Sequence, residues 1–495
     1  MSNVRVTYSG LISLVIGLTS VVTGLIFTLI VTRTLSPEEF GTWSLIGGLI
    51  TYVILIEPII AYWATREISR GIDSGKTAVF SSGVFSAFGI IGYIGIAYVV
   101  SFQSDIDLGI LLFSVILVPV IFLSRTLTAI NLGWKPQVVS YGMLGFELSK
   151  IPIAIILVYY LDMGLEGAIL TTAISHLVSI IILAYFAREK IKVKLKRQFL
   201  EKWLKLSWLP MYPSLASFIF TLDVAIFTII TGSVEGLAFW AVAIAISSLV
   251  LHSGSFSKGL YPKLLQGGKQ EHLQENLIRF LFFAIPLVVI SITFAKPGLF
   301  ALNPIYGIAI PVVIFMTFRA FFNTLSTLFA SSIAGIEKVD TNELSNFKDY
   351  IKSKLFFIPT LQLIHYSIYI IALTIVLLFT SSYESQINMV IDWAILSVAI
   401  QIPFTLYFLK IVKKNFSLKL DYQSIIKYIV TSVSVFGIIY ILMEEFLIYK
   451  NNIFEFLPNL LLFAILGVVG YIGITYLIDP RTKKLINLII LEIRK

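Results

Sequence analysis

Long apolar runs alternate with short polar segments along the whole chain. Each run has about twenty residues, the length that an α-helix needs to cross a hydrocarbon core ~30 Å thick. A transmembrane β-barrel would show much shorter segments in which apolar and polar residues alternate. The pattern therefore predicts an all-α polytopic membrane protein.

The apolar runs number about fourteen. The first run is too long for a signal peptide, and no small-residue cleavage site follows it, so we expect it to remain as the first spanning helix. We place the membrane-spanning helices near residues 9–31, 41–62, 78–101, 108–130, 137–160, 167–187, 207–230, 236–257, 279–295, 305–332, 356–380, 389–409, 428–448 and 457–478.

Composition supports the same class and narrows the chemistry. Of the 495 residues, 57% are hydrophobic and only 13% are charged, whereas a typical soluble domain has about 25% charged residues. The absence of cysteine excludes a disulfide framework, a thiol nucleophile and a cysteine-ligated metal site. The segment RGIDSGKT, at Arg70–Thr77, has the wrong glycine spacing for a phosphate-binding loop. We predict a protein that is not an enzyme and needs no cofactor or metal.

The net charge of +9 reflects topology. If both termini are cytoplasmic, 31 of the 37 lysines and arginines fall in cytoplasmic segments, which is the bias that orients helical membrane proteins. The outer loops contain only Arg33, Lys296 and Lys450. An even number of spans with cytoplasmic N- and C-termini follows.

The densest basic segment, REKIKVKLKRQF at Arg188–Phe199, follows the sixth span. We interpret it as a cytoplasmic retention signal that can also contact anionic lipid head groups. Docking of a partner protein is the alternative. Because it is the most polar stretch of the chain, it is also the natural boundary between two lobes.

A weak internal repeat relates the two halves of the chain. At an offset of 197 residues, Thr34, Ser36, Glu38 and Trp43 align with Thr231, Ser233, Glu235 and Trp240. Both stretches join the first two spans of a six-helix block, although a chance match between short turns is the alternative. A parallel repeat predicts two six-helix bundles related by an axis along the membrane normal. We expect an N-lobe at 1–187, a basic loop at 188–206, a C-lobe at 207–414, and two further spans with a cytoplasmic tail at 415–495.

Ionisable residues inside spans are costly, roughly 2.5–3.5 kcal/mol each near the bilayer centre, and so indicate function. Glu147 and Lys150 are three residues apart on one helix face, so they form either a structural ion pair or part of a cavity. The span of Arg319 contains no acidic residue, which favours a position where it meets water or an anion. The basic set is Arg125, Lys150 and Arg319, and the acidic set is Glu57, Glu147 and Asp223.

The first outer turn, RTLSPEEFGTWSLI, resembles the first-loop signature of prokaryotic polysaccharide flippases. These are the Wzx-like transporters of O-antigen and exopolysaccharide in the multidrug/oligosaccharidyl-lipid/polysaccharide (MOP) superfamily. The segment Tyr261–Phe280 is similar to the family's cytoplasmic segment after span eight. The residues of the first turn that fit the pattern are Arg33, Leu35, Pro37, Glu38, Phe40 and Gly41.

The resemblance implies that the first two helices of each lobe line a central cavity. This would put Glu57, next to Pro58 in the second span, and Asp223, in the seventh, near the transport path. Together with Glu147 they are candidates for coupling transport to a proton or cation. The alternative is that they are buried carboxyl groups with a structural role.

The resemblance also implies alternating-access transport of a polyprenyl-(di)phosphate-linked oligosaccharide from the inner to the outer leaflet, for surface glycan assembly. A hydrated cationic cavity suits the phosphate, and we predict that Arg319, Arg125 and Lys150 bind it. We expect a monomer in the plasma membrane of a prokaryote. Its partners would be membrane lipids and glycosyltransferases or a polymerase of the same pathway, with no nucleic acid.

Two other functions remain open at this point. One is a multidrug or metabolite antiporter of the same superfamily, driven by Na⁺ or H⁺, which would need acids to dominate the cavity. The other is a non-transporting scaffold or a scramblase in a glycan-assembly complex.

The predicted orientation can be tested by labelling, because the chain has no cysteine of its own. A cysteine introduced at Val193, in the basic loop, should resist a membrane-impermeant maleimide until the cells are permeabilised. A cysteine at Ser382, in a predicted outer loop, is the matched control and should label at once. Labelling at position 193 in intact cells would refute the orientation.

Overall fold

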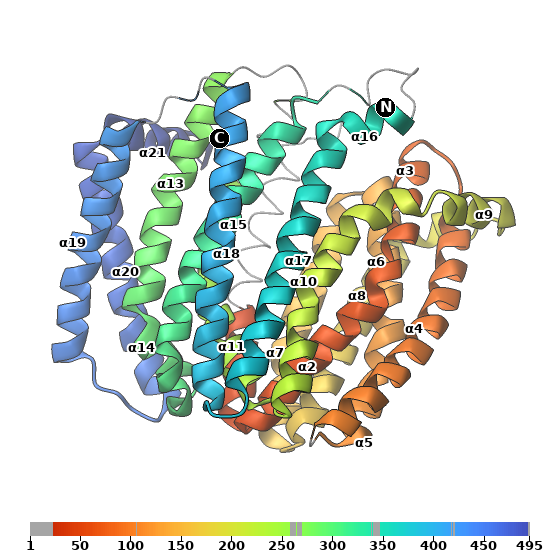
Figure 1. Ribbon diagram of the computed structural model, residues 1–495, viewed down its shortest axis with the longest axis horizontal. Coiled ribbons are helices and arrows are strands. Elements are labelled where there is room, and N and C mark those ends of the chain that lie inside the picture. The colour runs from red at the N-terminus through yellow and green to blue at the C-terminus, as the bar shows by residue number, and fades with distance from the viewer. Residues whose placement is uncertain are drawn as a thin grey trace. The chain divides into compact units, whose positions relative to one another are not determined.

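The structure is a computed structural model that describes residues 23–104, 106–257, 264, 270–337, 339, 347–416, 418 and 421–493. Thirteen helices in this part of the chain are long and apolar enough to cross a membrane, and they correspond one to one with the second to fourteenth predicted spans (Figure 1). The predicted first span, at 9–31, lies mostly outside the described residues. Residues 23–34, which are described, form an apolar helix. Helices with no strand among the described residues confirm an all-α, multi-pass membrane protein.

Contacts between helices divide the chain into two compact units. The first comprises Met1–Ala241 and Ile370–Met389, and the second comprises Val242–Tyr369 and Val390–Lys495. This division rests on contacts between helices and does not test the lobes predicted at 1–187 and 207–414. Their assignment stays a prediction.

Most helices of the first unit are membrane spans, several of them interrupted by short 3₁₀ or π turns. The helix α3 begins at Pro58, and one 3₁₀ turn lies between it and α2. The elements are α2 (Pro37–Val53), η1 (Ile54–Ile56), α3 (Pro58–Ser69), α4 (Gly75–Gln103), α5 (Leu108–Phe113), η2 (Ser114–Ile116), α6 (Leu117–Trp134), α7 (Gln137–Ala154), η3 (Ile155–Tyr160), α8 (Gly164–Ile191), α9 (Arg197–Lys205) and α10 (Trp208–Thr231).

The boundary between the units crosses three helices. These are α11 (Glu235–Ser247), α17 (Lys354–Thr380) and α18 (Gln386–Asn415). The remaining elements belong to the second unit: η4 (Ser248–Ser257), α13 (Gln270–Thr293), α14 (Ala295–Leu302), η5 (Pro304–Ala309), α15 (Ile310–Ala334), α16 (Phe347–Lys352), α19 (Tyr422–Phe446), α20 (Ile453–Ile478) and α21 (Pro480–Ile493).

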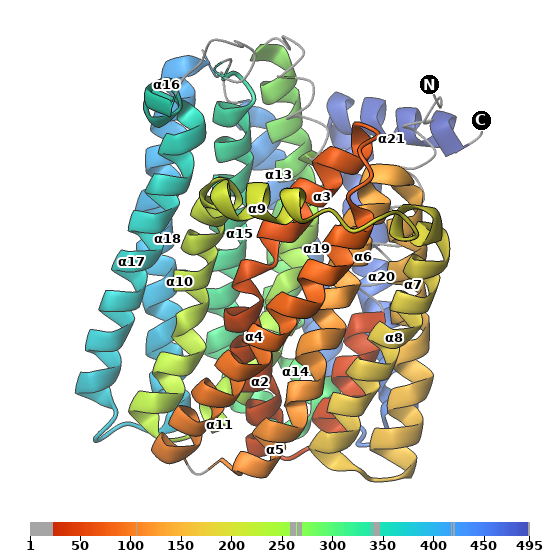
Figure 2. The same cartoon turned by 90° about the vertical axis from the view of Figure 1, so that its right-hand side faces the viewer.

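Most helices of the first unit run side by side (Figure 2). Small and amide side chains let them pack closely, as is common in membrane helix bundles. A Cβ on Gly142 of α7 would lie 2.7 Å from a methyl carbon of Leu183 of α8. The buried Asn131 amide of α6 donates to the carbonyl of the same Leu183 at 3.0 Å. These contacts fix α6 and α7 against α8.

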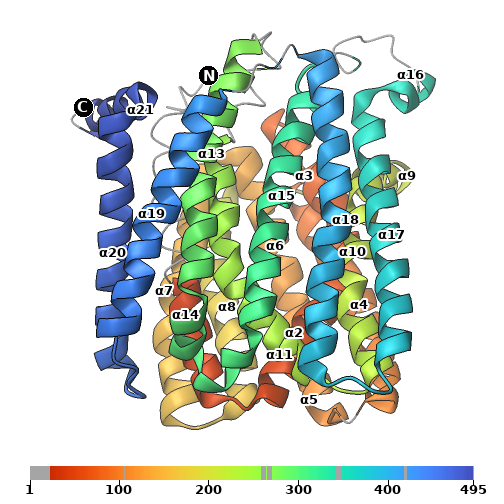
Figure 3. The same ribbon diagram turned by 60° about the vertical axis from the view of Figure 1, so that its left-hand side comes forward.

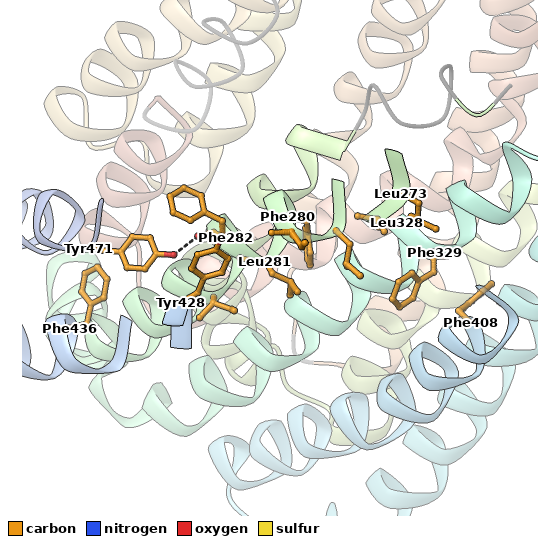
Figure 4. Packing of buried hydrophobic residues seen from close by; sticks show 14 of the residues in the cluster. Leu273, Phe280, Leu281, Phe282, Leu328, Phe329, Phe408, Tyr428, Phe436 and Tyr471 are labelled. Atoms are coloured by element: carbon orange, nitrogen blue, oxygen red, sulfur yellow. Dashed lines mark hydrogen bonds between the residues drawn. The ribbon is translucent and has the colours of Figure 1, made fainter. Parts of the chain in front are cut away.

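In the second unit, α13 packs against α15 on one side and α19 on another, and α19 packs against α20 (Figure 3). Pro286 of α13 has no N–H, so the Phe282 carbonyl four residues earlier loses its helical partner. The buried Tyr471 hydroxyl of α20 donates to this carbonyl at 2.8 Å (Figure 4). The last spanning helix is therefore joined to α13 where the proline interrupts the backbone hydrogen bonds.

Asp479 fixes the corner between α20 and α21. Its carboxylate accepts hydrogen bonds from the Tyr428 hydroxyl at 2.8 Å and from the backbone N–H of Thr482 at 3.0 Å. Burial alone would raise the pKa of Asp479, but these hydrogen bonds, with one from Ser424, outweigh burial and lower it. The carboxylate thus caps the first turn of α21 in its charged form.

Replacing Tyr471 by Phe should lower the free energy of unfolding by about 1 kcal/mol, because the Phe282 carbonyl then stays buried without a donor. Unfolding in detergent with increasing denaturant measures the change. Tyr440, on the exposed face of α19, is the matched control, and its replacement by Phe should change little. Equal effects of the two substitutions would contradict the role given to the Tyr471 hydroxyl.

Candidate functional site

The motif that carries the resemblance forms the start of α2. Ser36 is the N-cap, and it forms a capping box in which its hydroxyl accepts from the Glu39 N–H while the Glu39 carboxylate accepts from the Ser36 N–H. Pro37 occupies the first turn, where a missing N–H costs nothing. Arg33 is half-buried just before the cap, and Glu38 is exposed. The motif residues are thus explained largely by the geometry of this helix start.

Gly41 of the motif is required by a close backbone approach. A Cβ at this position would overlap the carbonyl oxygen of Val234, so no larger residue fits without movement. Val234 lies between Ser233 and α11, and the Ser233 hydroxyl accepts from the Glu235 N–H at the start of α11. The two turns that align at an offset of 197 residues therefore both begin with a serine cap and pack directly against each other.

The same helix contacts α10 through Tyr52. The Tyr52 hydroxyl donates to the Thr221 carbonyl at 2.6 Å and accepts from the Ala225 N–H at 3.4 Å. These two backbone groups are four residues apart and would pair with each other in a regular α-helix. The Tyr52 hydroxyl thus bonds to both groups of one turn of α10, which stays α-helical from Trp208 to Thr231. Asp223, which is only 4% exposed and interacts electrostatically with Tyr52, lies within the same turn.

Two of the predicted charged residues meet in the first unit. Glu57, at the break between η1 and α3, is 4% exposed, and its Oε1 has no hydrogen-bond partner among the described residues. Arg125 of α6 interacts electrostatically with it. Arg125 itself is exposed and forms no ion pair or hydrogen bond with the described residues, although α6 is part of a membrane span. The pair therefore combines a buried acid with an accessible cation.

Lys150 lies in different surroundings on α7. Its Nζ is 4.3 Å from the centre of the Phe27 ring and 5.3 Å from that of Phe146. It interacts electrostatically with Glu147, whose carboxylate also accepts from the Thr23 hydroxyl at 2.7 Å. The aromatic rings stabilise the ammonium. Of the two interpretations open for this pair, these contacts favour a structural role for Glu147, while Lys150 remains half-buried.

Arg319 of α15 is the predicted cation of the second unit. Its guanidinium carbon is 5.8 Å from the centre of the Tyr369 ring, and one nitrogen is 3.8 Å from the Met316 sulfur. The Trp393 indole N–H of α18 donates to the Tyr369 hydroxyl at 2.5 Å, which fixes that ring. His365 of α17 also interacts electrostatically with Arg319. The guanidinium thus lies beside aromatic side chains of α17, and one of these, Tyr369, is held by Trp393 of α18.

Sequence reasoning found the charged residues but missed the side chains that position them. Tyr52, Tyr369 and Trp393 sit in apolar runs where an aromatic residue is ordinary, so nothing in the sequence marked them. Among the described residues, no group of three or more histidine, aspartate or glutamate side chains could hold a metal ion.

No family model matches the sequence, and no curated protein matches it. Solved structures do match. The lipid II flippase MurJ, in an inward closed conformation, matches with a TM-score of 0.67 and 16% identity over 96% of this chain and 99% of that one. An inward-facing multidrug resistance MATE family transporter of the MOP superfamily matches with a TM-score of 0.60 and 14% identity over 82% and 98%.

A third match is a MOP superfamily transporter from Pyrococcus furiosus, characterised by the reverse polarity of its binding pocket, with a TM-score of 0.50 and 14% identity over 83% and 95%. At these identities the matches show the fold alone. The chain has the fold of MOP superfamily transporters.

The close approach at Gly41 gives a test that needs no transport assay. Replacing Gly41 by Ala should separate the start of α2 from Val234 and destabilise the protein by about 1–3 kcal/mol, as overpacking does. Gly47 is the matched control, because it lies on the same helix and a Cβ there would have no atom within 4 Å. Gly47→Ala should be neutral or slightly stabilising. Thermal unfolding of both variants measures this, and a Gly41→Ala protein as stable as the Gly47→Ala protein would contradict the packing of the two turns.

Proposed function

We propose that this protein is a flippase that moves a polyprenyl-(di)phosphate-linked oligosaccharide across the membrane by alternating access, in the manner of the Wzx-like transporters. The observation that carries the proposal is the extent of the match to the lipid II flippase. That match covers 96% of this chain, whereas the MATE transporter is matched over 98% of its own length yet covers only 82% of this chain. The difference between the two coverages is about the size of residues 422–493, which form α19–α21.

The chemistry of the substrate fits the exposed cation of the first unit. A guanidinium within a membrane span costs roughly 2.5–3.5 kcal/mol unless water, an acid or an anion meets it. Arg125 is exposed there, and its planar fork can donate two parallel hydrogen bonds to a phosphate. We assign Arg125 as the primary phosphate-binding residue.

Lys150 and Arg319 are the other proposed phosphate-binding residues. Each is half-buried among aromatic rings, which hold a cation in an apolar setting without neutralising its charge. Their side chains are less accessible than that of Arg125 in this structure, so we rank them after it.

The membrane potential can supply the driving force. Moving two negative charges outward against an inside-negative potential is favourable by ~4.6 kcal/mol per 100 mV, at ~2.3 kcal/mol per charge. Glu57 offers a second source, because a buried carboxylate oxygen that has no hydrogen-bond partner in the described part of the chain is a place to bind a proton or a cation. Asp223 and Glu147 are weaker candidates for coupling, since both already make interactions within the protein.

A coupled multidrug or metabolite antiporter is the second candidate function. Two observations favour it: the buried Glu57 oxygen, for which the described residues supply no hydrogen-bond partner, and the likeness in fold to the MATE transporter. Such a protein would bind cationic or neutral substrates. An exposed arginine repels a cationic substrate and has no charge to attract in a neutral one.

Arg125→Ala should leave the protein folded and reduce surface glycan at least tenfold, with the lipid-linked precursor accumulating on the inner leaflet. Arg319→Ala should have the same effect. Lysine at either position should restore export only in part, because it keeps the charge and loses the fork. Quantifying surface glycan and lipid-linked precursor in cells that express each variant measures the effect.

The matched control is Arg66→Ala, which removes an exposed arginine at the end of α3 that donates to the Tyr62 hydroxyl. Export should then continue at the parental rate. If both Arg125→Ala and Arg319→Ala export glycan as fast as this control, the phosphate is bound elsewhere and the assignment is wrong.

A further inference from the structure

The basic segment between α8 and α10 is an ordered part of the first unit. Trp203 of α9 is fully buried in a cluster with apolar residues of α3, α6 and α8. Lys202, beside it, forms an ion pair at 2.9 Å with Glu67 of α3, which is only 2% exposed. A buried acid that lost this partner would remain as an uncompensated charge, so the pair holds α9 firmly against α3.

The last turn of α8 and the turn before α9 are attached as well. Lys190 forms an ion pair at 3.0 Å with Asp73. The Thr77 hydroxyl of α4 accepts from the backbone N–H of Lys196 at 3.1 Å. A Cβ on Gly75 would overlap the Lys190 carbonyl oxygen, so the segment passes directly over the start of α4. The basic segment therefore has a fixed position on the ends of α3 and α4.

This position is at the membrane surface. The segment connects two spans, Gly164–Ile191 and Pro210–Thr231, with only 18 residues between them. Figure 2 shows α9 running across the helices of the first unit instead of parallel to them. A short helix held in this direction between two span ends lies in the interface plane.

The outer side of the segment combines positive charge with apolar side chains. Leu195, Leu204 and Trp208 are 43%, 49% and 46% exposed. Glu201, a nearby acid, forms its ion pair with Arg197, so it does not neutralise the other basic residues of the segment. The exposed basic residues are Lys192, Lys194, Lys196, Arg197, Lys202 and Lys205, of which Lys202 is paired with Glu67. Cations around an apolar centre, with a tryptophan at the edge, are the features of a surface that inserts at the head-group level.

We propose that residues 192–208 form a binding surface for anionic phospholipid head groups of the membrane that surrounds the protein. The lysines and Arg197 contact the phosphates, while Leu195, Leu204 and Trp208 enter the boundary between head groups and acyl chains. Because the segment is fixed to α3 and α4, it binds lipid without first having to become ordered. The proposal is independent of the transported substrate.

The test uses the full-length protein in nanodiscs, with one cysteine introduced at Leu195 and labelled with a fluorophore. Nanodiscs contain the same mole fraction of either brominated phosphatidylglycerol or brominated phosphatidylcholine, and quenching of the fluorophore reports which lipid is nearby. We expect at least twofold stronger quenching by the anionic lipid at low salt. The preference should decrease toward 1 M salt, where the Debye length falls to about 3 Å.

Replacing Lys192, Lys194 and Lys196 together by Gln should remove most of the preference. The matched control replaces Lys410, Lys413 and Lys414 by Gln, because these exposed lysines at the end of α18 carry the same charge elsewhere on the chain. The control should keep the preference, and thermal unfolding should show that both triple variants are folded.

Equal quenching by the two lipids would overturn the proposal, as would a preference that survives the Lys192/Lys194/Lys196 substitution. Loss of the preference in both triple variants would overturn it too, because it would show an effect of net charge alone. Absence of quenching by either lipid would also overturn it, because the surface would then stand away from the bilayer and serve a soluble partner instead.

Discussion

Within a bilayer no water is present to form hydrogen bonds with a backbone or charged group, so each such group needs a partner in the protein. Contacts between helices supply such partners in this protein. Pro286 frees the Phe282 carbonyl, and the Tyr471 hydroxyl of a helix nearly two hundred residues later satisfies it. The Tyr52 hydroxyl likewise bonds to the Thr221 carbonyl and the Ala225 N–H of α10. In each case a tyrosine hydroxyl of one helix is fixed on backbone groups of another.

Two of the charged residues predicted inside spans have partners of this kind, and two differ. Lys150 is stabilised by two aromatic rings, and Arg319 lies beside Tyr369 and Met316. Arg125 is exposed, and Oε1 of its buried neighbour Glu57 lacks a hydrogen-bond partner among the described residues. Other buried polar atoms, such as Glu67 Oε2 and Asn131 Oδ1, also lack such a partner among the described residues, so it is the exposed guanidinium beside a buried acid that sets this pair apart.

Features set by local sequence were predictable. Runs of about twenty apolar residues marked the spans, and the order of Ser36, Pro37 and Glu39 produced the capped start of α2. The six in-span charges were also visible in the sequence. Their surroundings were not, because the partners come from distant helices: Tyr52 meets residues 221–225, and Tyr369 meets Trp393. Gly41 was recognised as part of a motif, but only the structure shows that Val234 requires it.

The proposed cargo is an anionic lipid-linked oligosaccharide, and its movement can be measured directly. The protein is reconstituted in liposomes that contain a polyprenyl-diphosphate oligosaccharide with a fluorescent sugar, and a membrane-impermeant quencher reports how fast the inner-leaflet pool becomes accessible. We predict that the protein accelerates this exchange, that an outward driving potential accelerates it further, and that Arg125→Ala abolishes it. Exchange no faster than in protein-free liposomes, together with proton-driven efflux of a cationic dye by the same preparation, would contradict the proposed function.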